Sequence, residues 1–207
     1  ANARGHGAQT FAQSLQNSCN PAFITWGLMT GKDNMVKYME SLGLYSKTGV
    51  DLPGEAGSII HKTENIKELD LAIMSFGQSF QITPLQLLRA VSAVVNGGKL
   101  VTPHFGVKKI DTEGNISVLE YEESGTIIKQ STTETMRGLL KNVVELGGGL
   151  NCRIKGYSIA GKTATSEKLP RGNGKYIASF IGIAPAENPQ VIAMCIIDEP
   201  VGMHYGG

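Results

Sequence analysis

The sequence predicts an α+β fold in which an antiparallel sheet packs against helices. Two observations support this class. Capped helical patterns recur before residue 150, and three apolar segments rich in β-branched residues follow near the end of the chain. With 207 residues, of which 41% are hydrophobic and 18% charged, the chain is long enough to bury a substantial core as one domain.

The first helices are predicted from caps and breakers. A short helix precedes the segment 18–21, which interrupts it. Asn20 is expected to cap the next helix, because Pro21 suits its first position, and Gly31 is expected to end it. Asp33 is expected to cap the helix that follows.

The middle of the chain contains the clearest helix. Residues 44–68 are predicted to be mostly irregular, and residues 69–75 to be a short helix or a buried segment. Thr83 and Gln86 then have the spacing of a capping box, so a helix is predicted from there to the glycines at 96–98.

A small hairpin and another helix come next. Residues 101–110 and 116–121 are predicted to pair around a turn of Asp, Gly and Asn. Ser131 and Glu134 have the spacing of a second capping box, which predicts a helix that runs to the glycines at 147–149.

Three strands are predicted to end the chain, at 157–165, 176–184 and 191–198. The last two flank residues 185–190, a short connection with two prolines. Such a connection favours antiparallel pairing.

Composition excludes several classes of function. Lys and Arg number 19 and Asp and Glu 18, so the net charge of +1 gives no support to a nucleic-acid partner. No apolar run reaches membrane-spanning length. Cys19, Cys152 and Cys195 cannot form a disulfide framework and are expected to be reduced. No Cys-x-x-Cys or His-x-x-x-His spacing in the sequence suggests a zinc site.

The segment 158–168 has the most informative chemistry. Lys162 is expected near a strand end, where it gives a groove positive charge, and we expect a bulge or twist that aims the hydroxyls of Thr163 and Thr165 at one ligand carboxylate. On an edge strand, the Thr165 N–H is free to stabilise the oxyanion of an acyl transfer. The same residues also fit an exposed lysine and two threonines of an ordinary strand.

Ser18 and Asn20 form the second candidate motif. In a functional interpretation, Ser18 relays a proton and Asn20 holds a substrate carbonyl. In a structural interpretation, both cap the helix that begins at Pro21. The two interpretations are compatible, since one loop can serve both purposes.

Ser-x-Asn followed by Lys-Thr-Gly is a motif pair of penicillin-binding proteins and serine β-lactamases. The chain resembles the C-terminal part of the transpeptidase domain of class B penicillin-binding proteins, close to the sporulation and cell-elongation members. The resemblance covers nearly the whole chain and rests on residues 5–23, 51–55, 75–78, 83–86, 96–100, 156–168 and 178–185.

The resemblance implies a role for each motif residue. Ser18 would help move the proton of the nucleophile, and Lys162 would set the electrostatics of the groove and hold Ser18. Asn20 would hold the amide of a stem peptide or of a β-lactam. Thr163 and Thr165 would bind the terminal carboxylate. The Thr165 N–H would supply half of the oxyanion hole, and the N–H of the nucleophile itself the other half.

The chain departs from the family pattern in two ways. The nucleophile motif Ser-x-x-Lys occurs nowhere in the 207 residues. We therefore expect residues 1–207 to be a partial transpeptidase domain that lacks the nucleophile segment and the final helix, and to be inactive alone. Ala164 replaces the glycine of Lys-Thr-Gly at a substrate-binding position, and its added Cβ is expected to change β-lactam affinity mildly.

The resemblance implies a D,D-transpeptidase that cross-links peptidoglycan stem peptides and is acylated by β-lactams, with no cofactor. The intact protein would be anchored on the outer face of the bacterial cell membrane by an N-terminal helix, with division or elongation membrane proteins as partners, and the 207-residue chain itself would be soluble. Two alternatives stay open: a non-catalytic module that binds peptides, β-lactams or other proteins, and a β-lactamase or β-lactam sensor of the same superfamily.

Overall fold

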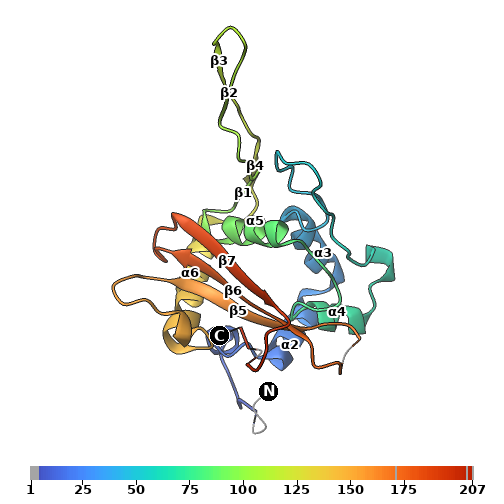
Figure 1. Cartoon of the computed structure of the whole chain (residues 1–207). Helices are drawn as coiled ribbons and strands as arrows, with labels where there is room; N and C mark the ends of the chain where they lie inside the picture. Colours follow the sequence, from blue (N-terminus) through green and yellow to red (C-terminus); the bar gives the residue numbers. More distant parts are fainter. Residues whose placement is uncertain (1–4, 171, 204, 207) are drawn as a thin grey trace.

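The computed structural model describes residues 5–170, 172–203 and 205–206. Helices pack against one face of a three-stranded antiparallel sheet, which confirms the predicted α+β class (Figure 1). Among the described residues, no helix is both long enough and apolar enough to span a membrane.

The chain opens with helices α1 (Phe11–Gln16), α2 (Asn20–Thr30) and α3 (Lys32–Ser41). The predicted cap at Asn20 is wrong. Asn20 is the first residue of α2, and Cys19 occupies the N-cap position without a side-chain bond. The predicted cap at Asp33 is also wrong, because Gly31 alone separates α2 from α3 and Asp33 lies inside the first turn of α3.

The middle of the chain contains the 3₁₀ helix η1 (Thr63–Asn65) and helices α4 (Glu68–Met74) and α5 (Pro84–Val95). The capping box of Thr83 and Gln86 is confirmed. The Gln86 side chain is 1% exposed, and its amide donates to two carbonyls of the irregular segment before η1. A first core joins α3, α4 and α5 and consists of Val36, Met39, Leu44, Ile66, Leu71, Met74 and Ala90.

Two small antiparallel pairs follow α5. Strand β1 (Lys99–Val101) pairs with β4 (Glu123–Thr126), and β2 (Lys108–Ile110) pairs with β3 (Ile116–Val118). The predicted hairpin is therefore confirmed, with shorter strands than expected. It extends away from the body of the molecule (Figure 1).

Helix α6 (Gln130–Leu146) is followed by the 3₁₀ helix η2 (Leu150–Cys152). The second predicted capping box is wrong. The helix begins at Gln130 with Lys129 as its N-cap, so Ser131 already lies within the first turn and no side chain caps the helix.

The sheet has the order β5–β6–β7, with β5 (Ala160–Glu167), β6 (Tyr176–Ala184) and β7 (Val191–Asp198) all antiparallel. Strand β5 starts and ends slightly later than predicted. Helices α5 and α6 cover one face through a second core, which consists of Val95, Leu140, Ala160, Ile183 and Ala186. Strand β5 lies at one edge of this sheet, next to the loop that joins α1 to α2.

Candidate active site

The loop between α1 and α2 meets the edge strand β5 at one hydrogen bond. Lys162 Nζ donates to Ser18 Oγ at 2.9 Å, across 144 residues of sequence. The same ammonium donates to the Thr163 carbonyl at 2.9 Å. Ser18 is exposed and has φ 51°, a left-handed conformation that is uncommon for serine and recurs at functional sites.

The backbone of α1 explains the conformation of Ser18. The helix ends as the N–H groups of Ser18 and Cys19 donate back to the carbonyls of Leu15 and Ser14, at 3.2 and 2.9 Å. This reversal turns the chain sharply before α2 begins. It presents the Ser18 hydroxyl to β5.

Strand β5 is regular, so the predicted bulge or twist is wrong. Each residue from Ala160 to Glu167 pairs in register with β6. Thr163 and Thr165 lie two positions apart and therefore share one face of the sheet without any distortion.

Hydrogen bonds to β6 alternate along β5, and this alternation determines which N–H groups of β5 face away from β6. The Lys168 N–H donates to Lys175 on the β6 side, and in an antiparallel ladder every second residue bonds to that partner. Thr163 and Thr165 are out of phase with Lys168, so their N–H and C=O groups point to the edge. The Thr163 carbonyl that receives Lys162 Nζ fits this alternation.

Burial controls the charge of the site. Desolvation lowers the pKa of the Lys162 ammonium from its ordinary value of 10.5. A partly desolvated ammonium beside a hydroxyl gives up a proton more readily than an exposed lysine does. The pair Ser18 and Lys162 is therefore chemically suited to proton transfer.

The remaining candidates lie on the same two elements. Asn20 is exposed at the start of α2, two residues after Ser18. Ala164 is exposed in the middle of β5, opposite Ser179. Thr165 Oγ1 accepts a hydrogen bond from the Gly206 N–H at 3.1 Å, so the last described residues of the chain lie against this strand.

Sequence reasoning missed a contact between α6 and the end of α1, two residues before Ser18. Gln16 at the end of α1 contacts the glycines after α6. The run of three glycines at 147–149 was a visible signal, but only as a helix terminator.

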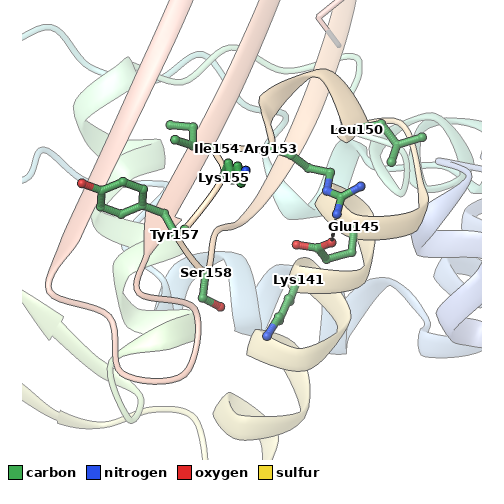
Figure 2. A pocket seen from close by; sticks show the side chains of 9 residues that line it. Lys141, Glu145, Leu150, Arg153, Ile154, Lys155, Tyr157 and Ser158 are labelled. Atoms are coloured by element: carbon green, nitrogen blue, oxygen red, sulfur yellow. Dashed lines mark ion pairs between the residues drawn. The ribbon is translucent and has the colours of Figure 1, made fainter.

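A separate hollow of about 710 Å³ lies beside the C-terminal half of α6 (Figure 2). Its lining includes Lys141, Arg153 and Tyr157 and none of the motif residues. Its charges are largely matched: Arg153 pairs with Glu145 at 3.0 Å, and Lys141 pairs with Glu187. Side-chain hydrogen bonds lower the pKa of the Glu187 carboxylate to about 2, and the bond from Lys141 contributes more than the bond from Ser158. The Lys141–Glu187 pair links α6 to the loop between β6 and β7, and the Arg153–Glu145 pair links α6 to the segment after η2.

Comparison with known proteins decides the family. The family model of the penicillin-binding protein transpeptidase domain matches residues 1–207. The chain belongs to this family. Its motif residues at positions 18–20 and 162–165 are therefore found within a transpeptidase domain.

Two curated relatives show how far the similarity extends. The chain is 38% identical to stage V sporulation protein D of Bacillus subtilis over 209 residues, which covers 98% of the chain and 32% of that protein. It is 29% identical to peptidoglycan D,D-transpeptidase FtsI of Escherichia coli, covering 96% of the chain and 33% of that protein. The chain thus spans about a third of the length of these relatives.

Solved transpeptidase domains have the same fold. Penicillin-binding protein 3 of Mycobacterium tuberculosis, in complex with aztreonam, matches with a TM-score of 0.87 and 26% identity over 93% of the chain and 46% of that structure. The transpeptidase domain of penicillin-binding protein 3 from Burkholderia pseudomallei matches with a TM-score of 0.83 and 28% identity over 98% of the chain and 60% of that structure.

Proposed function

We propose that this chain forms the proton-transfer and carboxylate-binding side of a serine D,D-transpeptidase site, in a protein that cross-links peptidoglycan stem peptides. The observation that supports it most is the 2.9 Å contact between Lys162 Nζ and Ser18 Oγ at the open edge of β5. The names of the D,D-transpeptidase relatives support the same reaction class.

The nucleophile is a serine of a Ser-x-x-Lys segment outside these 207 residues, since none occurs within them. Its Oγ attacks the carbonyl carbon of the penultimate D-Ala while its proton passes toward Ser18 and Lys162. The negative charge that forms on the carbonyl oxygen is held by the Thr165 N–H and by the N–H of the nucleophile.

The acyl group is then transferred in two steps, first to the serine and then to the acceptor amine. The C–N bond to the terminal D-Ala breaks, and the leaving amine takes the proton through Ser18. An amine of a neighbouring stem peptide next attacks the ester carbonyl, and the C–O bond to the serine breaks. The serine oxygen takes up the proton that the attacking amine loses. The hydroxyls of Thr163 and Thr165, with the charge of Lys162, bind the terminal carboxylate of the donor peptide, and the Asn20 amide holds its backbone.

A β-lactam presents a carboxylate and a reactive amide to the same groups, so it acylates the same serine. Penicillin-binding protein 3 of Mycobacterium tuberculosis has been solved in complex with aztreonam and with ampicillin, which supports this part of the proposal. The intact protein works at the outer face of the cell membrane, held there by an N-terminal helix, where division or elongation membrane proteins can reach it.

A labelled penicillin and mass spectrometry test the proposal. We expect no covalent adduct on the 207-residue chain and a stable adduct on the full-length protein that contains it. We expect Lys162→Ala in the full-length protein to slow acylation by about 100-fold or more, the usual scale for loss of a proton-transfer group.

Three other results would contradict the proposal. An adduct on the isolated chain would place the nucleophile within it. Rapid turnover of penicillin by the full-length protein would favour a β-lactamase. Reversible binding without an adduct would favour a non-catalytic module.

A further inference from the structure

The end of α1 is hydrogen-bonded to the end of α6 two residues before Ser18. Gln16 Nε2 donates to the Leu146 carbonyl at 2.8 Å, and the Gly148 N–H donates to the Gln16 carbonyl at 3.4 Å. Gln16 thus bonds to the end of α6 through both its side chain and its backbone. Only Asn17 separates it from Ser18.

Gly147 makes this close approach possible. A Cβ on Gly147 would lie 2.6 Å from Gln16 Cγ and 2.6 Å from the Gln16 carbonyl oxygen. Gly147 has φ −124° and ψ −151°, extended angles that any residue adopts. Glycine is therefore required here by the closeness of α1, and not by the backbone conformation.

The same turn also contacts the other half of the site. A Cβ on Gly148 would be in ordinary contact with Thr163 Oγ1, at 3.5 Å. The carbonyl of Val143, a fully buried residue of α6, accepts the N–H groups of Gly147 and Gly149 at 3.1 and 3.0 Å. A rigid turn therefore lies between the loop with Ser18 and the strand with Lys162 and Thr163.

We propose that the contact of Gln16 with Leu146, Gly147 and Gly148, the Gln16 clamp, sets the distance between Ser18 and Lys162 and so positions them for acylation. This inference rests on the proposed transpeptidase function. The clamp residues act through Ser18 and Lys162 and are positioning residues. A clamp is needed because the described contacts join the two side chains by one hydrogen bond, and Ser18 has a conformation that serine leaves readily when its surroundings allow.

Two variants of the full-length protein test the clamp. Gly147→Ala forces α1 away from α6, and Gln16→Ala removes the bond to Leu146 without adding atoms, so it remains informative if the first variant folds poorly. We expect Gly147→Ala to lower the rate constant of acylation by a labelled penicillin about 10- to 100-fold, the scale of an ångström-sized misplacement. Gln16→Ala should give a smaller loss in the same direction.

Each variant has a matched control. Gly138→Ala makes the same change within α6, where a Cβ meets nothing within 4 Å. Asn17→Ala removes a neighbouring side chain whose hydrogen bond goes to Gln9 instead of α6. Both controls should acylate within about twofold of the wild type, as for ordinary surface changes.

A second measurement separates positioning from general damage to the fold. Burial lowers the pKa of Lys162, so a larger separation of Ser18 from Lys162 that admits water should raise that pKa. Competitive acetylation of Lys162 across pH, read by mass spectrometry, measures the shift and needs no acylation by penicillin. A purely structural role would lower the melting temperature and leave the pKa of Lys162 unchanged.

The outcomes are distinguishable. Wild-type acylation rates in both clamp variants, or an unchanged Lys162 pKa in both, would overturn the clamp. If the wild-type protein itself is not acylated, the proposed function fails, and the pKa of Lys162 alone decides whether the clamp positions it.

Discussion

At the scale of single residues, Lys162 lowers the stability of the fold but supplies the ammonium group of the candidate site. Its ammonium is desolvated beside the end of β5, where it bonds Ser18 and the Thr163 carbonyl. Desolvation without a neighbouring carboxylate lowers its pKa, which penalises the charged form. Groups of this kind are characteristic of active sites, where activity and stability conflict.

We expect Lys162→Met to raise the melting temperature of the 207-residue chain at pH 7. Between the lowered pKa of folded Lys162 and its ordinary value of 10.5, the unfolded chain binds more protons, so the stability of the wild type rises with pH. The advantage of methionine should therefore shrink as the pH approaches 10. Thermal melts at both pH values check this, and an advantage that grows with pH would contradict the assigned direction of the shift.

Ala164 is the second residue with a measurable consequence. Ala164 lies between the two candidate threonines along the exposed part of β5, and its Cβ points to the face opposite theirs. We expect Ala164→Gly in the full-length protein to change the rate of acylation by β-lactams mildly, with a loss of about 0.5–1 kcal/mol of stability from the added backbone freedom. Equal acylation rates in the two proteins would remove the idea that Ala164 shapes the groove.

At the scale of elements, the β2–β3 hairpin shows how a projecting segment is fixed at its base. The Asp51 carboxylate accepts hydrogen bonds from the N–H groups of Phe105 and Gly106 and from the Tyr121 hydroxyl, at 2.9, 2.7 and 2.9 Å. His104 stacks on Tyr121 with ring centroids 3.9 Å apart. Beyond this anchor the hairpin has only its own pairing, and an isolated two-stranded hairpin is marginally stable.

Asp51→Ala should loosen the hairpin while the rest of the chain stays folded. The bonds from Gly106 and Phe105 lower the pKa of Asp51, so the anchor also weakens as the pH falls through that lowered pKa. We expect trypsin to cleave after Lys108 and Lys109 several-fold faster in the variant. Glu120→Ala, on the same hairpin, serves as the control. Equal cleavage rates would show that Asp51 does not hold the hairpin.

At the scale of the whole molecule, the sheet has two unlike faces. Helices α5 and α6 bury one of them (Figure 1). On the other face, β7 exposes Cys195 and Ile197 in the described part of the chain. The cysteines consequently differ in access: Cys195 is exposed, whereas Cys19 and Cys152 are partly buried.

We therefore expect a thiol reagent to modify Cys195 first in the 207-residue chain. Burial raises the pKa of Cys152, which lowers its thiolate fraction, so Cys152 should react more slowly than Cys195 at pH 8. Peptide mapping of the time course identifies the order, and Cys195→Ser should abolish the fast phase. A fast phase on Cys152 would contradict the assigned exposure of Cys195 and partial burial of Cys152.

The sequence by itself determined the elements whose signals are local. The capping box at Thr83, the apolar periodicity after it and the β-branched runs of β6 and β7 were sufficient to predict α5 and two strands. The same local rules were wrong for Asn20, Asp33 and Ser131, because a helix that begins one or two residues earlier places a capping residue inside the helix. The two motifs were also visible, since their residue types and order are carried by the chain itself.

Only the tertiary structure decided how the motifs meet. The contact of Ser18 with Lys162 spans 144 residues, and that of Gln16 with Leu146 spans 130. Such distances depend on how α1 packs on α6 and how α6 packs on β5. No local propensity encodes them, because they follow from the shapes of buried surfaces such as those around Gly147 and Val143.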